Sequence, residues 1–224
     1  MLWNGWTILI LAAGMIAGYL LGSVNFAIII TRLFGKGDIR DYGSGNAGMT
    51  NVLRTVGKGA AALTLLGDFS KGILSVGLVR LLLFLYTLLS GNAIPSVIFA
   101  EYLVAYAALL GHVFPLFYHF KGGKGILVSA GCMLILSPWS LVICLAAFLI
   151  LAILTRYISV GSIAAGIAFP IANGIVTYCQ SGWIGWQEVL LALPIALFVI
   201  FLHRANIQRL LTHTENKVSF KKIR

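Results

Sequence analysis

The sequence predicts an all-α integral membrane protein with seven transmembrane helices, some of them short, its N-terminus outside and its C-terminus in the cytoplasm. Two properties of the composition point to a membrane: a mean hydropathy of +0.99 and a charged fraction of only 10%. Soluble domains carry about 25% charged residues. The net charge of +10 does not indicate a nucleic-acid-binding domain, because such a domain needs no apolar runs of membrane length.

Six apolar runs follow one another along the chain: Trp6–Ile30, Gly72–Leu89, Ser96–Phe120, Ile126–Leu154, Tyr157–Tyr178 and Trp183–Leu202. The fourth exceeds the roughly 17–25 residues of one span, and Ser137-Pro138 interrupts it. Since proline usually kinks or ends a helix, this run is one bent helix or two short ones. The depth of Ile126–Ser137 stays open. The short apolar stretch Gly59–Gly67 is a re-entrant or surface helix, or the first turns of the second span.

The distribution of Lys and Arg favours two short helices. Cations occur in four segments between or after the runs: Arg32–Lys58, Lys121–Lys124, Arg156 and the tail Arg204–Arg224. By the positive-inside rule these segments belong in the cytoplasm. Six spans would separate the tail from the first basic loop, whereas a split at Ser137-Pro138 gives seven spans and places every basic segment on one side. We therefore expect a single integral membrane domain over residues 1–224.

The first basic loop is rich in small and polar residues. Glycines in Gly43–Gly48 let backbone N–H groups converge on an anion, and a helix starting after them would add its positive dipole end. Arg54, at helix-like i, i+4 spacing from Lys58, offers a fork for phosphate oxygens. Further hydrogen-bonding groups come from Ser44, Asn46, Thr50 and Asn51. The glycine spacing also fits a dinucleotide fingerprint, but no βαβ unit surrounds it; a flexible glycine turn is the alternative.

The second basic loop, Lys121-Gly-Gly-Lys-Gly125, places two cations among three glycines. It is not a nucleotide P-loop, because Tyr118 stands where the first glycine of that motif belongs and Gly125 where Ser or Thr belongs. A compact anion site remains, with an ordinary cytoplasmic turn as the alternative. His112, near the inner end of the third span, is either a packing residue or a site residue.

The remaining polar residues of interest lie after the last span and inside the membrane. His203, Asn206 and Leu210 recur on one face of a continuing helix. Glu215, one of only six acids, is expected to form a structural ion pair.

Charges inside the membrane are costly and usually functional. Arg80 and Glu101 lie at similar depth on either side of the turn Ser90–Pro95, so we expect a structural bridge between them. Asp68 and Lys71 lie nearer the inner surface.

Together these segments resemble a known family. The similarity is to the three cytoplasmic motifs of the bacterial acyl-phosphate:glycerol-3-phosphate acyltransferase, the PlsY family, and it is carried by Gly43-Ser-Gly-Asn-Ala-Gly-Met-Thr-Asn-x-x-Arg54, Gly111-His-x-Phe-Pro115 with Lys121-Gly-Gly-Lys-Gly125, and His203-Arg-x-Asn-x-x-Arg-Leu with Thr214-Glu-Asn. Asp68-x-x-Lys-Gly72 also resembles a family segment. Departures are small: Met49 replaces the usual Ala, His213 the usual Gly, and Ile126-Leu-Val-Ser the usual Val-Ala-Thr.

The resemblance implies transfer of a fatty acyl group from acyl phosphate to the 1-hydroxyl of glycerol 3-phosphate. The products are lysophosphatidic acid and phosphate, in the first step of phospholipid synthesis, at a cytoplasmic face of the bacterial inner membrane. It implies catalytic roles for Ser44, Arg54, His203 and Asn206, and a structural role for Glu215. The substrate and phosphate site is expected to comprise Gly43, Gly45, Asn46, Thr50, Asn51, Lys71, His112, Lys121, Gly122, Gly123, Lys124 and Gly125. Expected partners are the two substrates and membrane lipid, with no nucleic acid, metal or cofactor.

The chemistry agrees with the residues. No His-x₄-Asp pair, G-x-S-x-G elbow or Cys/His pairing occurs in the chain. Acyl phosphate is a mixed anhydride with a good leaving group, so the protein has only to position two anions and stabilise charge on the carbonyl oxygen. The base stays open between His203 and a phosphate oxygen of the donor.

Two other classes of protein are alternatives. A transporter or channel for an organic phosphate anion would place cations along a path through the bilayer, but 14 of the 16 cations lie in the predicted cytoplasmic segments. A non-catalytic lipid-binding scaffold would not need loops rich in Gly, Asn and Thr.

Overall fold

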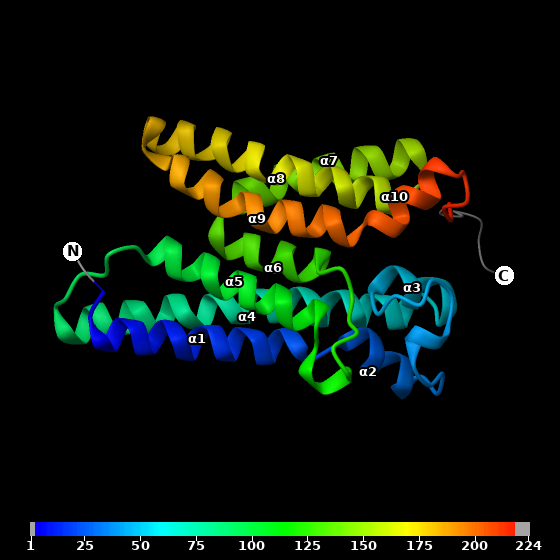
Figure 1. The fold of residues 1–224 in the computed structure, drawn as a ribbon, viewed down its shortest axis with the longest axis horizontal. Coiled ribbons are helices and arrows are strands. Elements are labelled where there is room, and N and C mark those ends of the chain that lie inside the picture. The colour runs from blue at the N-terminus through cyan, green and yellow to red at the C-terminus, as the bar shows by residue number, and fades with distance from the viewer. Residues whose placement is uncertain (1–2, 218–224) are drawn as a thin grey trace. The chain divides into compact units, whose positions relative to one another are not determined.

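The computed structural model describes residues 3–217 and divides them into two compact units, the first ending at Leu136 and the second beginning at Ser137 (Figure 1). Every regular element in this described part is helical, which confirms the predicted fold class. The first unit contains α1 (Gly5–Ser23), α2 (Phe26–Leu33), η1 (Ile39–Asp41), α3 (Met49–Thr55), α4 (Lys58–Ser90), α5 (Val97–Val113), η2 (Leu116–Tyr118) and α6 (Ile126–Leu136). The second contains α7 (Pro138–Thr155), α8 (Ile158–Ser181), η3 (Gly182–Gly185), α9 (Trp186–Leu202) and α10 (Arg204–Leu211).

Five helical segments between residues 3 and 217 are long and apolar enough to cross a membrane: Gly5–Leu33, Lys58–Ser90, Val97–Tyr118, Pro138–Thr155 and Ile158–Ser181. The bent pair α9 and α10 is a sixth candidate, whereas α6 has only 11 residues. The break at Ser137-Pro138 is confirmed, with Pro138 as the first residue of α7, where its missing N–H costs no helical hydrogen bond. A count of seven requires α6 as a short span, and that count, the orientation and the single domain stay predictions.

Helix α4 settles two questions about the region after the first basic loop. It is continuous over 33 residues, so Gly59–Gly67 forms its first turns. Arg54 and Lys58 do not share a helix, because α3 ends at Thr55 and Gly57 separates the two helices with a φ of +128°. Non-glycine residues rarely adopt that conformation. The expectation that Arg54 and Lys58 have i, i+4 spacing along one helix is therefore wrong.

Glycines allow α1 and α5 to pack closely in the first unit. A Cβ atom on Gly22 would lie 2.1 Å from the carbonyl oxygen of Ala108, and one on Gly111 would lie 2.1 Å from that of Tyr19. Small residues commonly let helix backbones approach in membranes. The contact fixes the C-terminal end of α5, which precedes the second basic loop.

The two ends of the first unit are stabilised differently. Under the first basic loop, apolar side chains form a buried cluster that includes Ile28, Ile39 and Val52. Toward the other end, Arg80 of α4 and Glu101 of α5 form the expected bridge, in which Arg80 Nη2 donates to Glu101 Oε2 at 2.8 Å. Glu101 is only 1% exposed, so the guanidinium neutralises a carboxylate withdrawn from water.

Candidate active site

The first basic loop is folded around the side chain of Asn51, in the first half of α3. Its amide nitrogen donates to the carbonyl oxygens of Ile39, Tyr42 and Asn46 at 3.1, 2.9 and 3.1 Å. Its amide oxygen accepts the backbone N–H of Ser44 at 3.1 Å. The side chain is 2% exposed and fully engaged with the loop, so Asn51 shapes the site instead of offering the phosphate contact expected from the sequence.

Two glycines in left-handed conformation present Ser44 at the surface. Gly43 has a φ of +59° and Gly45 a φ of +69°. Residues that carry a side chain rarely adopt this conformation. A Cβ atom on Gly43 would also lie 2.2 Å from Asn51 Oδ1. The N–H of Gly45 donates to Tyr42 O at 3.0 Å, so hydrogen bonds fix this turn. Ser44 is exposed between the glycines, and its hydroxyl makes no hydrogen bond to the described residues.

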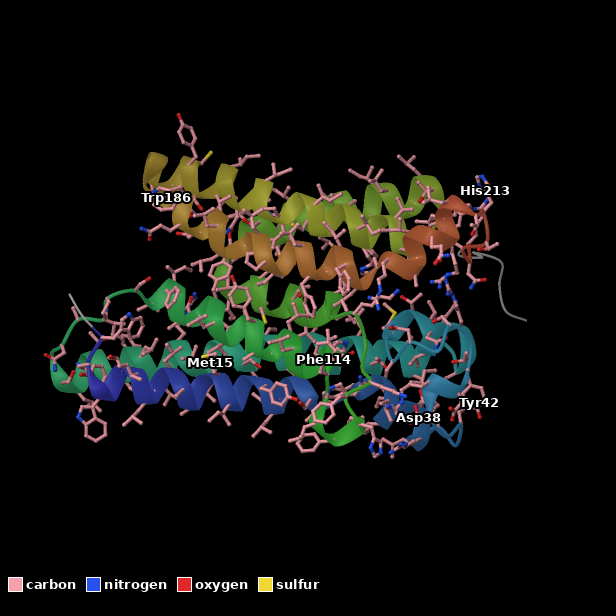
Figure 2. All side chains as sticks on the ribbon, in the orientation of Figure 1. Met15, Asp38, Tyr42, Phe114, Trp186 and His213 are labelled. Atoms are coloured by element: carbon pink, nitrogen blue, oxygen red, sulfur yellow. The ribbon has the colours of Figure 1, made fainter. Side chains whose placement is uncertain are left out.

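The remaining residues expected from this loop surround the start and end of α3. Asn46 and Thr50 are half-buried near its first turn, and Arg54 is exposed in its last turn. Gly48 is the N-cap and provides no side-chain hydrogen bond to the helix. The hydrogen-bonding groups and the cation are therefore displayed around one short helix, with Tyr42 and Asp38 at the same end of the unit (Figure 2).

The glycines of the second basic loop have a role different from the one expected. The N–H groups of Gly122 and Gly123 donate to the carbonyl oxygens of Val113 and His112 at 3.0 and 3.2 Å. These N–H groups therefore satisfy the end of α5 and are occupied, so any contribution of the two glycines to the expected anion site does not come from them. Lys121 is exposed and Lys124 half-buried, so the lysines are the groups that can meet an anion.

The same glycines are required by close packing. A Cβ atom on Gly122 would lie 1.9 Å from His112 O, and one on Gly125, whose φ is +78°, would lie 2.0 Å from Leu109 Cδ1. A Cβ atom on Gly123 would lie 2.5 Å from the carbonyl oxygen of Ala47. Because Ala47 belongs to the first loop, the two basic loops meet at Gly123.

Arg40 joins these two loops and was not among the site residues expected from the sequence. Its Nη1 donates to Tyr118 O at 2.8 Å and to Lys121 O at 3.1 Å. Its Nε and Nη2 donate to the carboxylate of Asp38 at 2.9 and 2.8 Å. These hydrogen bonds from Arg40 are the main reason that the pKa of Asp38 falls to about 2. The sequence signal is an acid two residues before an arginine, in a chain with six acids.

Lys71 and His112 lie together beneath the two loops. Lys71 Nζ is 2.9 Å from His112 Nδ1 and 2.9 Å from Asp68 Oδ1, and both Lys71 and His112 are 3% exposed. Lys71 therefore does not offer its ammonium to a phosphate, contrary to expectation, because protein atoms already surround it. His112 is packed in the interior and borders the second loop, and its role as a site residue stays a prediction.

In the second unit, the expected continuing helix is interrupted at His203. Helices α9 and α10 meet there at 51°. The His203 N–H donates to Ile200 O at 2.9 Å, three residues back, and ring Nδ1 lies 2.8 Å from Val199 O. The ring has thus replaced the backbone N–H as partner of the Val199 carbonyl. Since a carbonyl only accepts, Nδ1 carries a proton in this arrangement.

Glu215 closes the tail back onto this bend. Its carboxylate accepts from Arg209 Nε at 2.7 Å, from Asn206 Nδ2 at 3.0 Å and from Ser159 Oγ at 3.2 Å. Burial acts to raise the pKa of Glu215, but the hydrogen bonds from Arg209 and Asn206 outweigh it and the pKa is lowered. The ion pair expected for Glu215 is present, and it also orients Asn206.

The predicted residues thus form two groups. The first unit brings Ser44, Asn51 and Arg54 together with the Lys121–Gly125 loop through Arg40, His112 and the contact at Gly123. The second unit groups His203, Asn206 and Glu215. Among the groups of His, Cys, Asp and Glu in residues 3–217, none has the arrangement of a metal site.

Comparison with known proteins agrees with the resemblance. A sequence model of the glycerol-3-phosphate acyltransferase family matches residues 12–213. The glycerol-3-phosphate acyltransferase of Bordetella pertussis is 41% identical over 213 residues, covering 94% of this chain and 93% of the relative. That of Neisseria meningitidis serogroup C is 43% identical over 200 residues, covering 89% and 93%.

Solved structures give the same result. A crystal structure of PlsY, an integral membrane glycerol 3-phosphate acyltransferase in its glycerol 3-phosphate form, superposes with a TM-score of 0.74 at 30% identity, covering 96% of both chains. The lysophosphatidic acid form superposes with a TM-score of 0.71 at the same identity and coverage.

Proposed function

Because the chain belongs to the glycerol-3-phosphate acyltransferase family, we propose that it transfers a fatty acyl group from acyl phosphate to the 1-hydroxyl of glycerol 3-phosphate. The products are lysophosphatidic acid and phosphate. The enzyme is a multi-pass protein of the bacterial cytoplasmic membrane, with its active site on the cytoplasmic side. The observation that carries this proposal is that hydrogen bonds from Arg40 connect the two basic loops. This connection gathers cations and hydrogen-bond donors for phosphate.

Two anionic substrates require several cationic groups. Arg54 and Lys121 are exposed, and Lys124 is half-buried, so all three can reach phosphate oxygens. Arginine binds such oxygens as a bidentate fork and lysine as a point charge. The exposed hydroxyl of Ser44 supplies a further hydrogen bond. Acyl phosphate, glycerol 3-phosphate and membrane lipid are the partners that these groups fit.

The reaction proceeds by direct attack, without a covalent acyl-enzyme. The 1-hydroxyl oxygen of glycerol 3-phosphate bonds to the acyl carbonyl carbon, the developing oxyanion is stabilised by the cations, and the bond to phosphate breaks. Phosphate leaves with the electrons of that bond. The attacking hydroxyl loses its proton to a base.

We assign the base to His203. Its Nδ1–H is directed to Val199 O at 2.8 Å, and in a neutral ring with that tautomer Nε2 is the nitrogen that can accept a proton. Asn206, oriented by Glu215, lies one turn further along and is assigned a catalytic role beside it. A phosphate oxygen of the donor is the competing base.

A His203→Gln variant tests the assignment. General base catalysis contributes about 10²- to 10⁴-fold, so kcat should fall by about that factor. We expect the wild type to lose activity toward low pH as the base is protonated, and this loss should disappear in the variant. Steady-state rates from pH 5 to 9 measure both effects. His213→Gln is the matched control, because His213 is exposed in the tail, and it should leave the profile unchanged. Near-normal turnover of His203→Gln with an unaltered pH profile would mean that a phosphate oxygen of the donor, and not His203, accepts the proton.

The choice of donor is tested with purified protein in proteoliposomes and labelled glycerol 3-phosphate. We expect lysophosphatidic acid with acyl phosphate and none with acyl-CoA, because acyl phosphate is the donor that the family resemblance implies. Equal rates with both donors would overturn the donor assignment. No product from a folded protein, with uptake of glycerol 3-phosphate into sealed vesicles, would favour the transporter.

A further inference from the structure

The first apolar segment is broken in the middle of its course. Helix α1 ends at Ser23 and α2 begins at Phe26, within a segment of 29 residues that has the composition of one span. A break leaves carbonyl groups unpaired at the end of one helix and N–H groups unpaired at the start of the next. In a membrane such groups need protein partners. Asn25 supplies one of them, because its side-chain oxygen accepts the N–H of Ile28 at 3.1 Å.

Two charged residues of α4 supply the others. Lys71 Nζ donates to Gly22 O at 2.9 Å and to Val24 O at 2.6 Å, at the end of α1. Asp68, one turn earlier on α4, lies close to the backbone N–H of Phe26, the first residue of α2. The cation thus lies at the negative end of one helix dipole and the anion at the positive end of the other.

The third N–H of Lys71 determines the state of His112. An ammonium has three donors and no acceptor, and Lys71 Nζ is 2.9 Å from His112 Nδ1. With its two other donors directed to Gly22 O and Val24 O, Lys71 can donate its third to His112 Nδ1, and we assign the ring proton to Nε2 on this geometry. Asp68 Oδ1 lies 2.9 Å from Nζ without a hydrogen bond from the described residues, so it compensates the charge of Lys71. Asp68, at 1% exposed, is as buried as its two partners.

The proton of His112 points to the place where the two basic loops meet. A Cβ atom on Gly123 would lie 2.4 Å from His112 Nε2, so this ring nitrogen faces the backbone of the second loop. The end of α1 contacts η2, which leads into this loop, because Ser23 Oγ accepts the N–H of Leu116 at 3.2 Å. The helix break, the buried charges and the loop therefore form one connected structure.

We propose that Asp68 and Lys71 are positioning residues for acyl transfer, which fix the α1–α2 break and hold His112 as an Nε2–H donor against the second basic loop. This inference rests on the proposed function and adds to it one division of labour: the Lys121–Gly125 loop binds the phosphate of glycerol 3-phosphate, as the family resemblance implies, and Arg54 and Ser44 bind the acyl donor. The buried pair then controls the affinity for glycerol 3-phosphate without touching it. Binding of the acyl donor through Arg54 and Ser44 depends less on the pair.

The test uses full-length protein in proteoliposomes, labelled with ¹⁵N-histidine. In the wild type, the ring signals of His112, assigned with a His112→Gln sample, should show a protonated Nε2 and an unprotonated Nδ1. Lys71→Met removes the donor to Nδ1, so the ring should become a mixture of tautomers. The KM for glycerol 3-phosphate should rise by about tenfold or more, while the KM for acyl phosphate changes by less than about twofold. Unchanged ring signals and an unchanged KM for glycerol 3-phosphate would overturn the proposal.

The Arg80–Glu101 pair provides a matched control, because it joins the same helices, α4 and α5, away from the loops. The double variant Arg80→Gln/Glu101→Gln should lower the Tm and leave both KM values unchanged. If that control also raises the KM for glycerol 3-phosphate selectively, the effect of Lys71→Met is general destabilisation and the proposal fails.

A second pair of variants covers the case in which Lys71→Met does not fold. His112→Phe, which leaves the ion pair intact, should raise the KM for glycerol 3-phosphate, whereas His112→Gln, with an amide N–H near the position of Nε2, should largely restore it. Equal KM values in wild type and His112→Phe would overturn the proposal. The ring signals are independent of activity, so a wild type that shows the expected tautomer but forms no product refutes the proposed function and not the tautomer assignment.

Discussion

Replacing Asn51 with Asp is expected to lower kcat/KM by about 100-fold. The amide nitrogen of Asn51 donates to three carbonyl oxygens of the first basic loop, and an aspartate would place a buried acceptor against these acceptors. Loss of the bonds from the two amide N–H groups at ~1 kcal/mol each, with a further ~1 kcal/mol for an acceptor left against the carbonyl oxygens, is ~3 kcal/mol, which corresponds to about two powers of ten in rate. The loop presents Ser44 and adjoins the second basic loop, so the loss should appear in both kcat and KM. Steady-state rates with both substrates measure it.

Thr55→Val is the matched control for Asn51→Asp. Thr55 lies one turn further along α3, and its hydroxyl only donates to the backbone carbonyl of Asn51 at 2.8 Å. Removing that bond leaves the loop carbonyls paired, so activity should stay within about twofold of the wild type, because the helix carbonyl keeps its backbone partner. If Asn51→Asp retains wild-type rates, the loop does not depend on this amide.

Features with a strong local signal could be predicted from the sequence. The apolar runs predicted the helical membrane fold, and Pro138 predicted the end of α6, because proline imposes its effect on the backbone wherever it stands. The Arg80–Glu101 bridge followed from equal depth on two antiparallel helices, a geometric condition that needs no tertiary detail. The same applies to the ion pair of Glu215, since an acid among cations has few other partners.

Features that depend on distant contacts could not be predicted. The break after Ser23 has no proline or glycine in its two residues, and it is stabilised by Asp68 and Lys71 from another helix. The bend at His203 likewise depends on a ring that replaces a backbone donor. In the sequence Lys71 resembled a phosphate ligand, because a lysine near the inner surface can either bind phosphate or donate to buried protein groups. Only the fold shows that its donors are occupied.

The glycines of the second basic loop illustrate a different limit. Their spacing between lysines indicated a compact anion site, whereas the N–H groups of Gly122 and Gly123 are used to cap α5. Glycine has two physical uses, conformational freedom and close approach, and sequence spacing does not distinguish them. The expected location of the phosphate site is unaffected, because the lysines remain at the surface of the loop.

Gly122→Ala is therefore expected to impair the enzyme through packing. The added Cβ would lie 1.9 Å from the carbonyl oxygen of His112, a backbone atom that cannot move away without displacing the end of α5. The loop must move instead, and the hydrogen bond from Gly122 N to Val113 O at 3.0 Å is lost. Because the lysines move with the loop, the KM for glycerol 3-phosphate should rise by about tenfold or more, an effect of ~1.4 kcal/mol. Initial rates at varied glycerol 3-phosphate measure it.

Gly59→Ala separates this steric effect from the general consequences of replacing glycine. Gly59 lies in the first turn of α4, and nothing approaches within 4 Å of the position its Cβ would occupy. Alanine favours a helix over glycine by up to ~1 kcal/mol, so this variant should be as stable as the wild type or more so, with unchanged KM values. A Gly122→Ala enzyme with wild-type KM would mean that the loop tolerates displacement from α5, and that substrate phosphate is bound elsewhere. A Gly122→Ala enzyme that loses glycerol 3-phosphate affinity, beside an unaffected Gly59→Ala enzyme, would place the phosphate site on the loop that α5 supports.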